Sequence, residues 1–140
     1  MELESSETAE KIHLMESHRL DSFKIWPFTA ENNCNIKSMA EAGFYYCGTE
    51  NDSDSAACFC CGKVLNGWES TDIPIDEHRK HAPQCFFVKI GKFEKDLTVE
   101  EFLRVFQASI TGGISRKIVK TRIKIRSACH KFRNEFYKKF

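Results

Sequence analysis

The stretch CFCCGKVLNGWESTDIPIDEHRKHAPQC, residues 58–85, holds four of the chain's seven cysteines and two of its five histidines. Cys58 and Cys61 have the Cys-x₂-Cys spacing of a zinc knuckle, in which a tight turn directs two thiolates at one ion. His78 follows after 16 residues, and Cys85 after a further six. Four nitrogen and sulfur ligands close a tetrahedral site and leave no position for a catalytic water. The spacing therefore predicts one structural Zn²⁺ ion.

Two more groups in this stretch are candidate ligands. Cys60 points away from the other thiols if residues 58–61 are extended, so we expect it to pack rather than to bind metal. His81 lies one helical turn after His78, and the spacing alone leaves it as an alternative ligand. A conventional nucleic-acid-binding finger is not expected, because it needs about 12 residues between its ligand pairs.

Length and composition limit the setting. With 140 residues the chain forms one domain plus at most an extension, and a bound metal would support so small a core. No apolar run reaches the roughly 18 residues of a membrane span. The acidic start, MELESSETAEK, is unlike a secretory or mitochondrial leader. We therefore expect a nuclear or cytoplasmic protein, in which disulfides are disfavoured.

The charge is uneven along the chain. Residues 114–140 carry ten Lys+Arg and one acid, a net charge of +9, although the whole chain is only +1. The other 113 residues are therefore net acidic, at −8. This asymmetry predicts an acidic domain and a basic tail with different partners, and a basic tail can also contact nucleic acid electrostatically.

Turn and periodicity signals predict a mixed α+β domain. Strands are expected over 44–47, 56–60 and 63–65, with a turn at Asn66–Gly67. Helical segments are expected over 12–28, 38–43 with Ser38 as its cap, and 74–82.

A long helix is expected at the C-terminus. Thr98 and Glu101 have capping-box spacing, and apolar residues recur at helical intervals as far as Phe140. Gly112–Gly113 would kink or end this helix, and residues 118–126 also alternate like a strand.

Several motifs together resemble a known family. They are Arg19, FKIWPF (23–28), MAEAGFYYCGTEND (39–52), Cys58-x₂-Cys61, GWE (67–69), DEHRKH (76–81) and Cys85. In this order they resemble the baculoviral inhibitor-of-apoptosis repeat, and most closely its survivin-like members with a single repeat and a C-terminal helix. The resemblance implies a three-stranded antiparallel sheet with short helices around zinc. It also leaves His81 free and implies the ligand set Cys58, Cys61, His78 and Cys85.

Trp68 suggests a binding groove. It follows Gly67 in a turn, where a large indole is difficult to bury. An exposed indole, an apolar floor at Leu65 and the acid Asp72 would accept a small side chain and a free α-ammonium, while a strand edge pairs with an extended peptide. The alternative without a binding function is a core tryptophan surrounded by solvated charges.

The resemblance implies a ligand for this groove, the N-terminal Ala-Arg-Thr of a histone tail with its threonine phosphorylated. Asp72 would meet the ammonium, and Leu65 and Trp68 would enclose the alanine methyl. Lys63 and His81 would face the phosphate. Asn66 stands where survivin-like proteins usually have a second acid, so a weaker attraction is expected.

The resemblance also implies partners for the C-terminal helix, namely borealin and the inner centromere protein in the chromosomal passenger complex with Aurora B kinase. The protein would then act at centromeres in the nucleus, at the spindle midzone and in the cytoplasm. Self-association is a further expectation, and a helix folded back on its own domain is the alternative. The predicted dimer or partner-helix residues are Leu97, Val99, Phe102, Phe106, Ile118, Ile125 and Phe132.

We accordingly predict a disordered segment 1–14, a zinc domain 15–90, a linker and dimerisation segment 91–97, and a helix 98–140. A non-enzymatic adaptor is the favoured function. The alternative is an apoptosis antagonist that binds caspases or Ala-initiated antagonist peptides in the same groove. An enzyme is not expected, because Cys129 and His130 are too few for a RING finger and no nucleophile motif is present.

Overall fold

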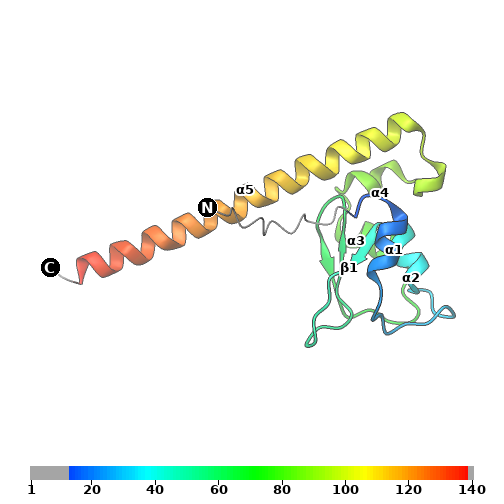
Figure 1. The fold of residues 1–140 in the computed structure, drawn as a ribbon, viewed down its shortest axis with the longest axis horizontal. Coiled ribbons are helices and arrows are strands. Elements are labelled where there is room, and N and C mark those ends of the chain that lie inside the picture. The colour runs from blue at the N-terminus through cyan, green and yellow to red at the C-terminus, as the bar shows by residue number, and fades with distance from the viewer. Residues whose placement is uncertain (1–12, 139–140) are drawn as a thin grey trace, which may run out of the picture.

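A three-stranded antiparallel sheet forms the centre of the domain (Figure 1) in this computed structural model, which describes residues 13–138. Its strands are β1 (Phe44–Tyr46), β2 (Ala56–Cys58) and β3 (Val64–Leu65), in the order β1-β2-β3. The central strand β2 is buried throughout, because apolar residues cover both of its faces. The predicted strands are all present, and the α+β fold class is confirmed. β3 is an edge strand within the described part of the chain.

Short helices surround this sheet. They are α1 (Glu16–Ser22), α2 (Ile36–Glu41), α3 (Pro74–His81), α4 (Phe86–Ile90) and the 3₁₀ turn η1 (Glu94–Asp96). The helix predicted over 12–28 is restricted to α1. The predicted cap of α2 is wrong, since Asn35 Oδ1 accepts the Ser38 amide at 3.0 Å and the helix begins at Ile36. The sequence did not predict α4, because five residues are too few to show a helical period.

Arg19 ties the N-terminal helix to the rest of the domain. Its side chain is fully buried, at 0% exposure. The guanidinium donates to the Leu14 carbonyl at 2.6 Å, lies 3.5 Å from the Glu94 carboxylate and stacks 4.5 Å above the Phe59 ring. Residues 1–12, which carry most of the predicted disorder, lie outside the described residues.

The C-terminal helix α5 (Val99–Tyr137) is continuous. It begins with the predicted capping box, in which Thr98 Oγ1 accepts the Glu101 amide at 3.2 Å and Glu101 Oε2 accepts the Thr98 amide at 2.9 Å. The strand alternative for residues 118–126 is wrong. None of the described helices, α5 included, combines the length and the apolarity that a membrane span requires.

The glycine pair in α5 neither kinks nor ends the helix, so the predicted kink or break is wrong. The helix runs through both glycines, and Figure 1 shows no sharp bend there. A Cβ on Gly112 would lie 3.3 Å from the Cys60 carbonyl oxygen and 3.0 Å from Arg116 Nη1. Glycine at position 112 therefore lets the helix backbone approach the turn after β2 closely, whereas a Cβ on Gly113 would have no contact shorter than 3.9 Å.

Only the first half of α5 packs on the domain. Val105 is buried there, whereas every described side chain from Lys117 to Lys138 is exposed. Figure 1 shows this second half extending away from the domain. The alternative of a helix folded back on its own domain therefore holds only as far as Arg116.

Candidate metal centre and peptide groove

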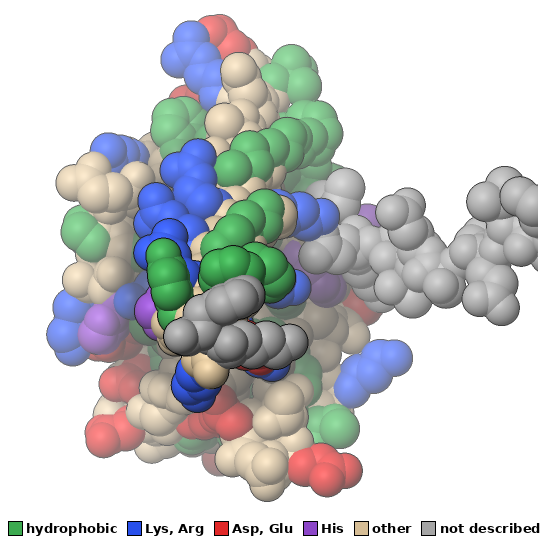
Figure 2. Space-filling view, turned by 90° about the vertical axis from the view of Figure 1, so that its left-hand side faces the viewer, with side chains coloured by type: hydrophobic (Ala, Val, Ile, Leu, Met, Phe, Trp, Pro, Cys, Tyr) green, Lys and Arg blue, Asp and Glu red, His purple; other side chains and the backbone are tan. Residues whose placement is uncertain are grey.

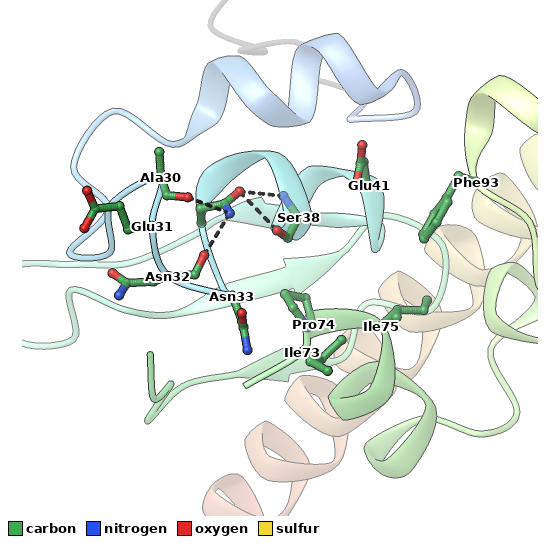
Figure 3. Close-up of a pocket in the computed structure, with 11 residues that line it drawn as sticks. Ala30, Glu31, Asn32, Asn33, Ser38, Glu41, Ile73, Pro74, Ile75 and Phe93 are labelled. Atoms are coloured by element: carbon green, nitrogen blue, oxygen red, sulfur yellow. Dashed lines mark hydrogen bonds between the residues drawn. The ribbon is translucent and has the colours of Figure 1, made fainter. Parts of the chain in front are cut away.

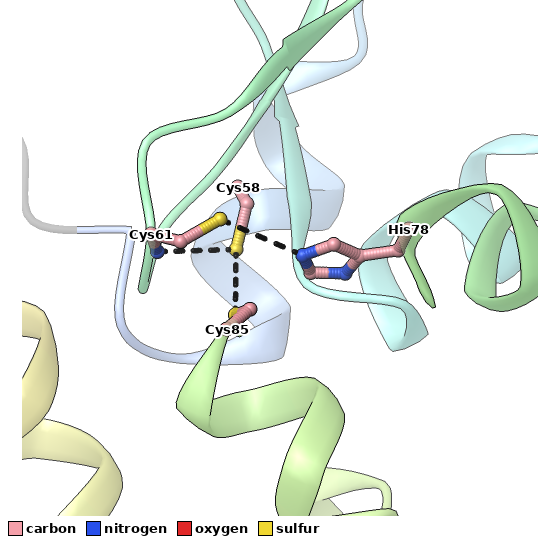
Figure 4. Close-up of side chains that lie close together, drawn as sticks. All are labelled: Cys58, Cys61, His78 and Cys85. Carbon is pink, nitrogen blue, oxygen red and sulfur yellow. Dashed lines mark hydrogen bonds between the residues drawn. The ribbon is translucent and has the colours of Figure 1, made fainter. Parts of the chain in front are cut away.

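The four predicted metal ligands converge between the end of β2, α3 and the start of α4 (Figure 4). Their donor atoms all lie within 4.8 Å of one another. Cys58 Sγ is 3.9 Å from Cys85 Sγ, and Cys61 Sγ is 3.7 Å from His78 Nε2. Cys61 is half-buried and the other three are buried. This arrangement can hold one metal ion.

Hydrogen bonds from outside the cluster orient two of the ligand residues. His78 Nδ1 lies 2.8 Å from the Ala42 carbonyl, which only accepts, so Nδ1 carries the proton and Nε2 is left for a metal. Cys58 Sγ accepts the amides of Cys60 at 3.3 Å and Cys61 at 3.5 Å. These bonds favour the thiolate that a metal requires.

Without a metal, burial and mutual contacts change the pKa of three of the four candidate ligands. Burial lowers the pKa of His78, but hydrogen bonds and charge from Cys61 and Cys85 outweigh it and raise the pKa to about 9. Burial, with its neighbouring thiols, raises the pKa of Cys58. Hydrogen bonds from Cys58 and the neighbouring thiols lower the pKa of Cys85. A bound cation would displace these protons, so metal binding is coupled to pH.

The two alternative ligands lie outside this cluster. Cys60 is buried in the core, and its pKa is raised by a hydrogen bond with Cys85 and by burial. His81 is exposed, and its Nε2 lies 3.2 Å from Glu77 Oε2.

A groove of about 280 Å³ lies between β3 and α3. The structure brings all six predicted peptide-binding residues together there. It also adds Glu77, which was not predicted from the sequence. The i,i+4 spacing of Glu77 and His81 could have indicated that the two side chains pair on one face of the helix. Besides Val64, Gly67 and Glu77, the lining residues are Lys63, Leu65, Asn66, Trp68, Asp72 and His81.

Trp68 is buried, so the predicted exposed indole is wrong. Only 7% of the residue is exposed. Its ring packs edge-on against Phe44, with centroids 5.4 Å apart, and against Trp26 at 6.4 Å. Its backbone amide donates to Asp54 Oδ2 at 2.9 Å. Trp68 therefore belongs to the core and also lines the groove.

Acidic groups surround one part of the groove. Asp72 Oδ2 accepts the Glu69 amide at 2.8 Å, which fixes the carboxylate. Asn66 Nδ2 donates to Asp52 Oδ2 at 3.4 Å. The pKa of Asp52 is lowered by hydrogen bonds from Ser55 and Asn66. A charged acid thus lies directly behind Asn66, and the sequence concealed it because the two residues are 14 positions apart.

A second cavity, of about 410 Å³, lies between the loop before α2 and the start of α3 (Figure 3). At its edge, Ser38 Oγ donates to Asn35 Oδ1 at 3.1 Å and Asn35 Nδ2 donates to the Asn32 carbonyl at 2.8 Å. Asn33 Nδ2 donates to the Thr71 carbonyl at 3.0 Å. These amides hold the loop, so the cavity is not a candidate site.

The predicted partner-helix residues lie in two environments. Leu97, Phe102 and Phe106 are half-buried, and Leu97 packs against the core, whereas Phe132 is 70% and Ile125 59% exposed. Figure 2 looks along α5 from its C-terminal end and shows hydrophobic side chains beside a row of lysines and arginines. The remaining predicted residues, Val99 and Ile118, are also exposed.

Comparisons with known proteins agree with this geometry. The Inhibitor of Apoptosis domain (BIR) matches residues 19–89. Baculoviral IAP repeat-containing protein 5 of Rattus norvegicus is 50% identical over 103 residues, covering 74% of this chain and 72% of the relative. The Mus musculus protein of the same name is 50% identical over 103 residues, 74% of each chain, and the Cavia porcellus protein is 40% identical over 121 residues, 81% of this chain and 85% of the relative. The chain therefore belongs to the inhibitor-of-apoptosis family, among its survivin-like members with a single repeat.

Proposed function

We propose that this protein is a non-enzymatic adaptor that binds the free N-terminus of a phosphorylated histone tail and docks partner helices through α5. Within the chromosomal passenger complex it would support mitotic chromosome segregation and cytokinesis. The observation that carries the proposal is the distribution of charge in the groove. Lys63 and His81 also line the adjoining cavity beside Cys61 and Cys85, which Asp72 does not line. Glu77 pairs with His81 on this side of the groove and leaves Lys63 as its unpaired cation among the described residues.

The proposed metal is zinc. Tetrahedral zinc, with Zn–S of about 2.3 Å and Zn–N of about 2.0 Å, separates two sulfurs by about 3.8 Å and a sulfur from a nitrogen by about 3.5 Å. The Cys58–Cys85 separation of 3.9 Å and the Cys61–His78 separation of 3.7 Å fit these values. Three sulfurs and one imidazole leave no open position, so zinc would supply stability, roughly 10–16 kcal/mol in zinc-finger peptides.

The peptide would extend along the edge strand β3, as in strand addition. Its α-ammonium would face Asp72, and Leu65 and the edge of Trp68 would enclose an alanine methyl. Lys63 and His81 would bind a phosphate on the third residue by charge-assisted hydrogen bonds. Asp52 behind Asn66 supplies the negative charge that the asparagine itself lacks.

The second candidate is an apoptosis antagonist that binds caspases or Ala-initiated antagonist peptides. The same ammonium end of the groove would accept such peptides. Lys63 favours the phosphorylated ligand, because an apolar antagonist peptide gives this cation no anion to bind. The imidazole of His81 can add a hydrogen bond to the phosphate.

The exposed half of α5 supports the docking of borealin and the inner centromere protein, and with them Aurora B kinase. At 100° per residue its apolar stripe, which includes Ile118, Ile125 and Phe132, is flanked by a basic row about 100° away on each side. Helices that pack on this stripe are therefore expected to carry acidic residues at their flanks. The rows contain Lys120, Lys124 and Lys131 on one side and Arg122, Arg126 and Arg133 on the other.

The same rows disfavour pairing of two copies along this half, because like charges would face each other. A homodimer would instead use the segment around Leu97, Val99 and Phe102. Contact of the basic rows with nucleic acid is a weaker proposal, since the apolar stripe between them requires an apolar partner. The proposed locations are the centromere, the spindle midzone and the cytoplasm.

Peptide binding tests the function. We expect an Ala-Arg-phosphoThr peptide with a free amine to bind at least tenfold tighter than its acetylated form, because acetylation removes the ammonium charge and costs more than about 1.4 kcal/mol. Equal affinities would reject the ammonium pocket. A phosphate that adds nothing to affinity would reject the histone ligand and favour the antagonist peptides.

A further inference from the structure

Helix α5 binds the turn that carries two of the metal ligands. Ser109 Oγ donates to the Phe59 carbonyl at 2.9 Å, and Arg116 Nη1 donates to the Cys60 carbonyl at 3.4 Å. Phe59 and Cys60 are the two residues between the ligands Cys58 and Cys61. Both carbonyls of the turn are therefore held by side chains from a helix about 50 residues further along the chain.

The contact is closely fitted. A Cβ on Gly62 would lie 2.6 Å from Arg116 Nε, and a Cβ on Gly112 would lie 3.3 Å from the Cys60 oxygen. Glycines on both sides thus make room for the guanidinium and for the helix backbone. Val105, one turn before Ser109, is 1% exposed and anchors this part of the helix in the core.

The peptide planes connect these bonds to the metal ligand. The Phe59 carbonyl shares its plane with the Cys60 amide, and the Cys60 carbonyl shares its plane with the Cys61 amide. These two amides are the ones that donate to Cys58 Sγ, at 3.3 and 3.5 Å. Each carbonyl and the amide that follows it point in opposite directions from one rigid peptide plane. A side chain that binds the carbonyl therefore also fixes the direction in which the amide points, toward Cys58 Sγ.

We propose that Ser109 and Arg116 are positioning residues of the metal centre, which hold the two peptide planes of the turn and so couple metal retention to the docking of α5. The coupling is reciprocal, because two equilibria linked through one contact change each other by the same factor. Metal binding thus strengthens the attachment of residues 99–116, and a helix detached from the turn releases metal faster. The inference does not depend on the identity of the peptide or the partner helices.

The helix provides matched controls. Ser115→Ala and Arg122→Ala remove the same side chains from exposed positions of α5, where no side-chain hydrogen bond to another described residue is found. The test compares these variants with Ser109→Ala and Arg116→Ala in the full-length chain loaded with Zn²⁺. The first readout is the rate at which an excess of chromophoric chelator removes the metal. We expect each test variant to release zinc about fivefold faster than wild type, the equivalent of about one hydrogen bond or 1 kcal/mol, and the controls to match wild type.

A second readout separates positioning from a general loss of stability. In the Co²⁺-substituted protein, the absorption bands from thiolate to metal respond to hydrogen bonds on the sulfur. We expect these bands to shift in Ser109→Ala and Arg116→Ala and to remain unchanged in both controls. Release rates equal to those of the controls would overturn the proposal. Faster release with unchanged cobalt bands would also overturn it, because the variants would then have loosened the domain without affecting the ligand.

Discussion

Replacing the buried Arg19 by methionine should destabilise the domain by about 3–5 kcal/mol. The guanidinium donates to the Ala40 carbonyl at 2.9 Å and the Leu14 carbonyl at 2.6 Å, and it lies 3.5 Å from Glu94. Methionine fills much of the volume and retains the contact with Phe59, so the loss is mainly electrostatic. Two carbonyls lose charge-assisted bonds, at about 1.5–3 kcal/mol each, and breaking a buried pair costs a similar 3–5 kcal/mol in total.

The assay is urea unfolding of the metal-loaded protein near pH 7, followed by circular dichroism. Arg79→Met is the matched control, because its pair with Asp76 is exposed at both ends and should contribute less than about 1 kcal/mol. Arg19→Met combined with Glu94→Gln should recover part of the loss by removing the unpaired carboxylate. A loss below about 1 kcal/mol in Arg19→Met would refute the view that this buried cation joins the N-terminal helix to the domain.

Three further outcomes are expected. Trp68→Ala should cost about 3–5 kcal/mol of stability as well as peptide affinity, since the ring is buried; a variant of unchanged melting temperature would contradict this. Apparent zinc affinity should rise with pH through neutrality, because the metal must displace protons from His78, whose pKa in the metal-free cluster is about 9, and from Cys58, whose pKa is raised by burial. Calorimetry in buffers of different ionisation enthalpy should detect this proton release, and its absence near pH 7 would count against it. Ile125→Glu should abolish binding of partner helices and leave the melting temperature within about 1 °C, because the side chain is 59% exposed. The control is Ile123→Glu, the same change at a 60% exposed position on the opposite side of the helix. Equal loss in both variants would show that the added charge, and not its place on the apolar stripe, governs docking.

Most of the Cys-His cluster and the α+β fold were predictable because their signals are local or nearly so, although the choice of His78 over His81 came from the family resemblance. Cys58-x₂-Cys61 encodes its own turn, and Pro74 marks the start of the helix that presents His78. The capping box of Thr98 and Glu101 likewise requires only three residues of spacing. Such features depend little on the remainder of the chain.

The features that the sequence did not reveal depend on distant partners. The burial of Trp68 is set by Trp26 and Phe44, which lie far from it in sequence but form one aromatic layer. The charge behind Asn66 comes from Asp52 in the loop between β1 and β2. Helix propensity predicts that glycines bend or end a helix. It does not consider that a glycine also allows the helix backbone to approach another segment of the chain.

Gly112 is the clearest example of a residue whose role depends on a distant segment of the chain. Its position in the sequence predicts a kink or an end, whereas its position in space explains a close contact with the Cys60 carbonyl. The same contact brings Ser109 and Arg116 onto the metal-binding turn. Sequence periodicity described α5 as a partner-binding helix and gave no indication that its first half contacts the metal centre.

The most direct test is elemental analysis of the purified, folded chain by mass spectrometry, with Cys61→Ser as the comparison. One tightly bound zinc per chain, and a Cys61→Ser variant that binds little metal and unfolds at a much lower temperature, is the predicted result. A folded wild-type protein without zinc, or a Cys61→Ser variant that melts like wild type, would contradict the metal-centred account.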